Sequence, residues 1–357
     1  MKRGLVVLDP AEIPPGELEQ RVAALQQTLA QRGLAAALVY ADVFHSGDVT
    51  YLSNICLYWN EAVLAVPAAG RPALLTKLSR RVHPWMRATS NLDDLRSGPR
   101  LAALAAQYLG ELPPGGIGLA EKDWWPAQIV EDLAQELPGR DLSDLGSVVR
   151  RRRQVPSEPE VTLLRRASAL TAGSVASGLG REFTNHERAG RAELTARRGG
   201  AEDVNVYCHS STPDADTIEV VSEYRGYWTG AARVLARPGA TWASSLAAAY
   251  QAASSELRAG ATRDHIAAAA QPALTGSGLG WQLDLIHHTD LETDGGYRTS
   301  RQRAEPVPDR SVVTLRLELE LPGGSSAALA DTFLVAAGSA DCLTSGPSGP
   351  VNTDEAA

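Results

Sequence analysis

The stretch from Thr217 to Ala236, TIEVVSEYRGYWTGAARVLA, constrains the fold more than any other part of the chain. Apolar and polar residues alternate on both sides of Arg225-Gly226, which is typical of two strands joined by a tight turn. The sequence therefore predicts a β-hairpin here, and the rest of the chain is interpreted around it.

Composition and charge restrict the class of protein. A chain of 357 residues is long enough for two domains, and 44% hydrophobic with 21% charged residues is ordinary for a soluble globular protein. The formal charge of -8 argues against nucleic acid as the main partner. One basic run, Arg150 to Arg153, is interpreted as a solvated linker.

The cysteines and the apolar segments bear on the compartment. Cys56, Cys208 and Cys342 are far apart and lack metal-type spacing, so a disulfide framework is not expected. The start of the chain has too short an apolar run for a signal peptide, and no stretch approaches the ~20 apolar residues of a membrane span. We therefore expect a cytoplasmic protein with no membrane partner.

Helical and strand patterns alternate through the first 149 residues, which predicts an α/β domain. The expected helices cover residues 17–32, 100–109 and 127–136. The expected strands cover residues 35–40, 49–53, 62–66, 73–76 and 117–120. Around residues 148–159 the composition changes to VVRRRRQVPSEP, and its two prolines favour a domain linker.

Helices precede and follow the hairpin in the second half. Helices are expected over residues 161–179, 187–198, 242–257 and 262–274, and Thr184 with Glu187 has the form of a capping box. Strands are expected over residues 204–208, 283–286, 311–321 and 327–336, with a polar loop over residues 287–310.

The hairpin resembles that of the creatinase/prolidase/methionine-aminopeptidase family, the pita-bread hydrolases. That family has the signature D-x-G-x-x-x-x-G-Y-x-x-D followed by Arg, and Gly226, Tyr227 and Arg233 are in register with it. The run DVTYLSN and the joint at Arg153, Ser157 and Glu160 are also similar to the family.

The resemblance implies an α+β, Xaa-Pro dipeptidase-like architecture. A creatinase-like α/β N-terminal domain would cover residues 1–149, a linker residues 150–160, a pita-bread domain residues 161–345 and a flexible tail residues 346–357. It also implies a homodimer.

The positions that hold two metal ions in the family carry other residues here. By the family's patterns, these positions are Glu219, Gly230, Leu291, Arg316 and Ala330. A two-metal hydrolase needs several carboxylates and a histidine to hold the ions and activate a water. The resemblance therefore implies a degenerate site, with no metal and no cofactor.

Charge balance leads to a geometric prediction. Carboxylates packed together without metal ions repel one another, and Arg316 near Glu219 would restore neutrality. We expect these two side chains to approach within about 6 Å, the range of a close charge pair.

Three functions remain open. The first is a non-catalytic binding or scaffold protein whose pocket holds a peptide or small molecule. The second is a metal-independent, creatinase-like hydrolase of a C–N bond, with His287 or His288 as general base and Glu318, Glu320 and Arg233 positioning the substrate. The third is a metallopeptidase with relocated ligands, drawn from Asp284, His287, His288, Asp290, Glu292 and Asp294.

Overall fold

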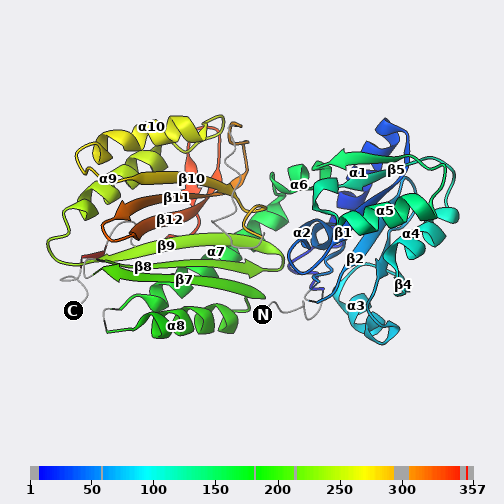
Figure 1. Cartoon of the computed structure of the whole chain (residues 1–357), viewed down its shortest axis with the longest axis horizontal. Coiled ribbons are helices and arrows are strands. Elements are labelled where there is room, and N and C mark those ends of the chain that lie inside the picture. Colours follow the sequence, from blue (N-terminus) through cyan, green and yellow to red (C-terminus); the bar gives the residue numbers. More distant parts are fainter. Residues whose placement is uncertain are drawn as a thin grey trace. The chain divides into compact units, whose positions relative to one another are not determined.

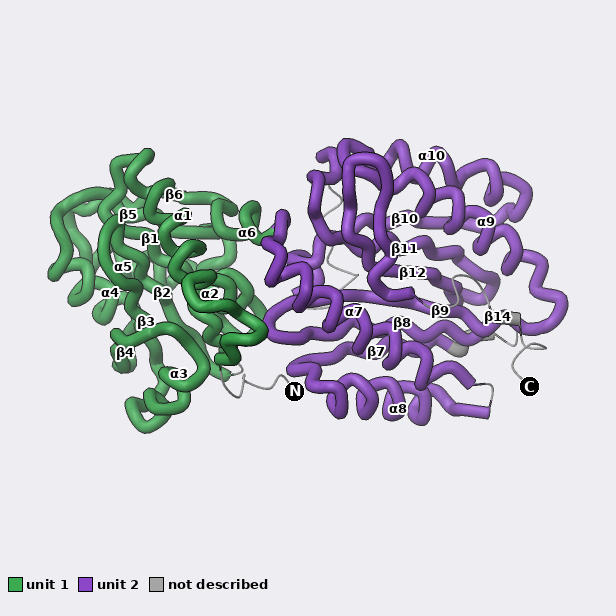
Figure 2. Tube along the Cα trace, turned by 180° about the vertical axis from the view of Figure 1, so that it is seen from behind, with its two compact units in different colours: residues 1–153 green, residues 154–357 purple. Residues whose placement is uncertain are grey.

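The computed structural model describes residues 8–57, 59–180, 182–212, 215–292, 305–345 and 351–352. The chain divides into two compact units, residues 1–153 and residues 154–357 (Figure 2). The division falls inside the segment 150–160 that is predicted to be a linker.

The first unit is an α/β domain (Figure 1). It is built on a six-stranded mixed sheet in the order β4-β3-β2-β1-β5-β6. Its helices are α1 (Glu17–Arg32), α2 (Gly47–Ser53), α3 (His83–Thr89), α4 (Leu101–Gly110), α5 (Ala127–Glu136) and α6 (Val148–Arg153), with short 3-10 helices at Arg80–Val82 and Lys122–Trp124. Its strands are β1 (Leu34–Ala41), β2 (Ala62–Pro67), β3 (Ala73–Thr76), β4 (Asp94–Ser97), β5 (Gly116–Ala120) and β6 (Leu142–Gly146).

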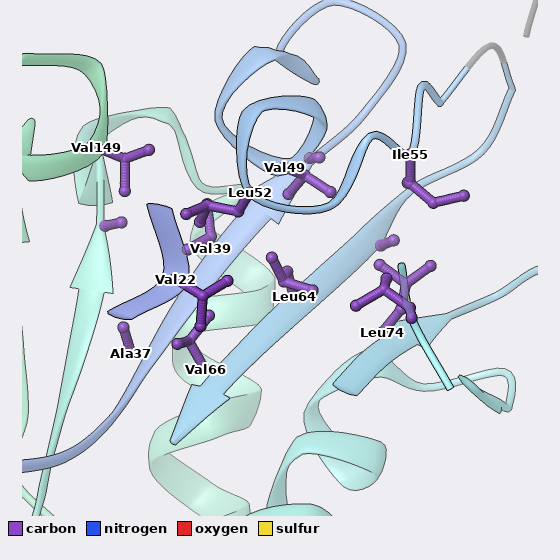
Figure 3. Close-up of a cluster of buried hydrophobic side chains, with 14 of the residues drawn as sticks. Val22, Ala37, Val39, Val49, Leu52, Ile55, Leu64, Val66, Leu74 and Val149 are labelled. Atoms are coloured by element: carbon purple, nitrogen blue, oxygen red, sulfur yellow. The ribbon is translucent and has the colours of Figure 1, made fainter. Parts of the chain in front are cut away.

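Helix α1 shows how the sequence builds this domain. Its apolar residues recur at helical spacing and bury Leu18, Val22, Leu25 and Leu29 against β1 and β2. Gly33 ends the helix with φ of 65°, a left-handed conformation that glycine adopts at little cost. The resulting core joins side chains from α1, α2 and the central strands (Figure 3).

The strand predicted over residues 49–53 is wrong, because these residues form helix α2. The run Val-Thr-Tyr favours a strand locally, but Val49 and Leu52 are spaced for one face of a helix and both are buried in the core. Helix α3, strands β4 and β6 and helix α6 were not expected from the sequence.

The basic run is not a solvated linker. Arg150 and Arg153 lie in helix α6 and are buried. The Arg153 guanidinium donates to Asp48 at 2.8 Å, and Arg150 lies 3.2 Å from Glu121. The charges therefore hold α6 to helix α2 and to the loop at Glu121.

The second unit contains the predicted hairpin at the centre of a larger sheet, with strand order β10-β11-β12-β9-β8-β7. Its helices are α7 (Glu158–Gly178), α8 (Asn185–Arg198), α9 (Trp242–Ser255) and α10 (Arg263–Leu274). Its strands are β7 (Asp203–Thr212), β8 (Ala215–Tyr224), β9 (Tyr227–Ala236), β10 (Trp281–His287), β11 (Val312–Leu321), β12 (Ser325–Val335), β13 (Ala340–Cys342) and β14 (Val351–Asn352). Strand β13 pairs with β12, and β14 pairs with β9.

Helices α7 to α10 pack against one face of this sheet, which we call the helix-covered face (Figures 1 and 2). Ile218 and Val220 of β8 and Ala231 of β9 meet α7 and α8 on this face, and alternate leucines of β11 meet α9 and α10. Side chains at the intervening positions point the other way, to what we call the front face. The expected capping box is present, because the Thr184 hydroxyl accepts from the Glu187 N–H and the Glu187 carboxylate accepts from the Thr184 N–H.

Among the helices that the structure describes, none combines the length and the apolar composition of a membrane span.

Candidate functional site

The hairpin of β8 and β9 turns at Arg225-Gly226, as predicted. Both residues have positive φ, 55° for Arg225 and 85° for Gly226, which matches the tight two-residue turns that connect antiparallel strands. The register pairs Glu219 with Ala232 and Val221 with Gly230. Glu219 and Gly230 therefore lie on the same face of the hairpin, one diagonal step apart.

A single row of residues crosses the sheet through Glu219. Successive pairings join Asp284 of β10 to Arg316 of β11, then Ala330 of β12, Ala232 of β9 and Glu219 of β8. Directly opposed residues in antiparallel strands point to the same face, so all five side chains project from the front face. Three of the five positions given by the family pattern are thus in one row.

The predicted approach of Arg316 and Glu219 is confirmed. The guanidinium donates from Nε to Oε2 at 3.0 Å and from Nη2 to Oε1 at 2.7 Å, a bidentate contact. Both side chains are buried, with 9% and 3% exposed. The two residues are on strands separated by β12 and β9, and the methyl side chains of Ala330 and Ala232 leave room for the contact between them.

Two further acids surround the guanidinium. Its Nη1 donates to Glu318 Oε2 at 2.6 Å and lies 3.7 Å from Asp284 Oδ2. Burial would raise the pKa of Glu318, but the hydrogen bond and charge of Arg316 outweigh it and hold this pKa below its ordinary value. Burial raises the pKa of Asp284, although a hydrogen bond from Gln282 and the charge of Arg316 oppose the change.

Burial alone would lower the pKa of the Arg316 guanidinium. The hydrogen bonds and charges of Glu219 and Glu318 more than compensate, and the pKa is raised above its ordinary value. Arg316 is therefore a permanent cation at the centre of the front face.

Gly230 contributes backbone groups only. Its N–H donates to Thr332 Oγ1 at 3.0 Å and its carbonyl accepts from the same hydroxyl at 2.9 Å. Thr314 Oγ1 lies 2.8 Å from Thr332 Oγ1. The space beside this position is thus occupied by threonine side chains that join β9, β12 and β11.

Leu291 belongs to an apolar cluster on the front face and is 1% exposed. The cluster consists of Val221, Trp228, Ala232, Ile286, Leu291, Ala328 and Ala330. All five positions given by the family pattern therefore lie on the front face. There Arg316 and Glu219 form an ion pair that is surrounded by apolar and hydroxyl side chains.

The structure does not bring the creatinase-like candidates together. His287 pairs with Val313 at the end of β10, while Glu318 pairs with Gln282 five residues earlier on that strand. The distance along the strand is about 17 Å, and strand alternation sends His287 to the opposite face from Glu318. Glu320 is exposed.

His288 and Arg233 have other surroundings. The His288 ring stacks on Tyr227 with centroids 6.2 Å apart, and the Tyr227 hydroxyl donates to Glu160 at 3.0 Å. Arg233 lies on the helix-covered face, where it donates to Asp331 at 2.7 Å. A shared site of His287 or His288 with Glu318, Glu320 and Arg233 is therefore not formed.

Asp331 was not singled out from the sequence. It accepts hydrogen bonds from Arg233, from the Tyr250 hydroxyl at 3.0 Å and from Thr344 at 2.8 Å, and it is 1% exposed. The sequence does contain an indication of this buried acid, because Asp331 is the one charged residue in a strand of apolar and small residues.

The residues considered for relocated metal ligands do not form a group. Asp284 contacts Arg316 and Gln282, and Asp290 and Glu292 lie in the turns after β10, while Asp294 lies outside the described residues. Within the described ranges, no three or more His, Cys, Asp or Glu side chains are grouped so that they could hold a metal ion.

Comparison with known proteins agrees with this architecture. Residues 21–155 match the model of the creatinase/prolidase N-terminal domain. No curated protein sequence matches the chain.

Among solved structures, the chain is similar to an X-Pro aminopeptidase from Thermotoga maritima, with a TM-score of 0.80 and 17% identity over 93% of this chain and 99% of that one. It is also similar to dipeptidase PepE from Mycobacterium ulcerans, with a TM-score of 0.74 and 20% identity over 95% and 99% of the two chains. For the prolidase from Pyrococcus horikoshii the TM-score is 0.75, with 14% identity over 93% and 100%.

The resemblance stated from the sequence is thus confirmed for the fold. Residues 21–155 are a creatinase/prolidase N-terminal domain, and the chain as a whole has the two-domain pita-bread fold of the Xaa-Pro peptidases.

Proposed function

We propose that this chain is a pita-bread protein in which an ion pair has replaced the dinuclear metal site, and that it acts by binding and not by hydrolysis. The observation that carries the proposal is the bidentate contact of Arg316 with both carboxylate oxygens of Glu219. Fold similarity alone does not supply an activity, which depends on the residues of the site.

The residues present do not fit a pair of metal ions. Of the five positions, only Glu219 carries a side chain that ligates cations, and Arg316 occupies both of its oxygens. A divalent ion at this place would also lie beside the guanidinium charge, in a buried site where repulsion is weakly screened. Without bound metal there is no water of lowered pKa to attack a peptide bond.

The front face retains features of a binding surface. Glu318 is 25% exposed beside Arg316, and the half-buried Tyr207 and His209 of β7 lie on the same face. The similar structures are described as X-Pro aminopeptidase and Xaa-Pro dipeptidase. We therefore propose a peptide or small molecule as the ligand of this face.

Metal content and turnover test the proposal together. The purified chain is incubated with Mn²⁺, Co²⁺ or Zn²⁺, desalted and analysed for bound metal, and then assayed on Xaa-Pro dipeptides and proline-containing tripeptides. We expect neither stoichiometric metal nor turnover. Stoichiometric metal accompanied by metal-dependent hydrolysis would refute the proposal.

A restored variant provides the positive control. It combines Gly230→Asp, Leu291→His, Arg316→Glu and Ala330→Glu, which returns the ligand types to the family positions. We expect this variant to bind divalent metal while the parent does not. Metal binding by both proteins to the same extent would show that the Arg316 contact does not exclude the ions.

The oligomeric state and compartment are proposed from the resemblance and the composition. We propose a homodimer in the cytoplasm, which light scattering coupled to size exclusion and fractionation of cells would test. A monomer at micromolar concentration would contradict the first expectation.

A further inference from the structure

A pocket of about 390 Å³ lies on the helix-covered face, away from the Arg316 site. Helix α7 forms one wall, strand β9 contributes the floor, and the segment after β13 forms the other wall. The lining residues that the argument uses are Gly173 of α7, Arg233 of β9, and Thr344 and Ser345 after β13; the others are small or apolar. Its volume falls within the range of pockets that hold small molecules.

Most of the lining is apolar and small, and one charged side chain is placed in it. Arg233 is 4% exposed and donates four hydrogen bonds, to the carbonyls of Ala232, Ala330 and Thr344 and to Asp331. A guanidinium has five N–H groups, and the fifth, on Nε, donates to no group among the described residues. The pocket is therefore mostly apolar, and its polar residues are Arg233, Thr344 and Ser345.

The charge of Arg233 is already balanced. Asp331 lies 2.7 Å from the guanidinium, so an anionic ligand at Arg233 would also meet the field of a buried carboxylate. A neutral acceptor such as an amide or ketone carbonyl can take a hydrogen bond from the guanidinium without adding a charge. The chemistry thus favours an uncharged ligand over a carboxylate.

Helix α7 presents mainly small residues to the pocket, and Gly173 has no side chain at all. Glycine is, apart from proline, the residue least favourable within a helix. Gly178 of the same helix has a packing reason, since an added Cβ would lie 2.2 Å from Ile218. An added Cβ at Gly173 would meet nothing within 4 Å, so no contact in the described part of the chain requires a glycine there.

We infer that this pocket between α7, β9 and residues 343–345 binds a small, uncharged and largely apolar molecule that accepts a hydrogen bond from Arg233. The site lies on the other face of the sheet from Glu219 and Arg316, so the inference is independent of the proposed loss of metal.

Three related probes test the class of ligand on the full-length chain. Phenylacetamide is uncharged with an acceptor, phenylacetate is its anionic counterpart, and phenethylamine is a cation without an acceptor. Dissociation constants are measured by ligand-observed NMR titration. We expect phenylacetamide to bind at least about tenfold more tightly than either charged probe.

Variants at Gly173 locate the binding and avoid disturbing the buried Arg233 pair. Gly173→Leu places a side chain over the pocket and is expected to weaken phenylacetamide binding at least about tenfold, whereas Gly173→Ala changes it by less than about threefold. Undiminished binding to Gly173→Leu, binding of phenylacetate as tight as that of phenylacetamide, or no binding of phenylacetamide would each overturn the inference. We expect the metal content of both variants to match that of the parent, which separates this result from the test of the proposed function.

Discussion

Replacing Arg316 by methionine tests the ion pair at the centre of the front face. The substitution keeps much of the apolar stem and removes the guanidinium, which leaves Glu219 buried without the donors that now occupy both of its oxygens. Removing one partner of a buried ion pair typically costs 3–5 kcal/mol, because the remaining charge is neither solvated nor compensated. We therefore expect the free energy of unfolding of the second unit to fall by about 4 kcal/mol at neutral pH.

The assay needs to report on the second unit, because the chain has two compact units that can unfold separately. Hydrogen exchange of the β8 and β11 amides, measured against urea concentration, gives the local free energy of opening. A buried carboxylate without its counter-charge takes up a proton more readily, so the loss should shrink as the pH is lowered from 7 towards 4.

Two controls separate charge burial from general damage. Arg165→Met removes the partner of Asp341 in an exposed pair with a similar distance of 2.7 Å, and we expect a loss below about 1 kcal/mol. The double variant Glu219→Gln/Arg316→Met removes both charges of this pair and should recover part of the stability, because Glu318 and Asp284 still lose the guanidinium. The reasoning is refuted if Arg316→Met costs no more than Arg165→Met.

Three further substitutions have expected outcomes. Burial and the charge of Glu223 raise the pKa of Glu202 from 4.5 to about 8. Glu202 therefore keeps its proton in the folded state to a higher pH than in the unfolded state, and the protein loses stability as the pH rises from 4.5 to 8. Glu202→Gln should therefore raise the free energy of unfolding by up to about 3 kcal/mol at pH 7 and by little at pH 4.5. Urea midpoints that are the same for the variant and the parent at both pH values would contradict this. Asp331→Ala leaves Arg233 buried without its counter-charge and should cost about 3–5 kcal/mol in the same urea assay. Ala330→Leu should cost about 1–3 kcal/mol by overpacking, and unchanged exchange of the β8 and β11 amides would show that the space is not used as described.

The hairpin and strand β11 could be predicted because their signals are local. Arg225-Gly226 fixes the turn, and strict alternation over residues 311–321 assigns the leucines to one face. The same alternation predicts only that Arg316 is on the opposite face. It does not reveal that this face is buried there, since the partner Glu219 is 97 residues away in sequence.

The resemblance supplied what local patterns could not. It placed Glu219, Gly230, Leu291, Arg316 and Ala330 as members of one site, and the structure puts them on one face. The helix over residues 47–53 is not predicted, because local preference points to a strand there. Seven residues are too few for helical spacing to outweigh the strand preference of Val49 and Thr50.

The alanines at 232 and 330 determine the order in which mutations could rebuild a catalytic centre. The contact between Arg316 and Glu219 is made across these two positions, so an acid introduced at either one would first pair with the guanidinium. The added acid would also have to fit into the space that the two methyl groups leave for this contact, and it would give no advantage in binding ions while the arginine remains. A path back to a hydrolase therefore has to begin with the loss of the arginine, a step that by itself destabilises the protein.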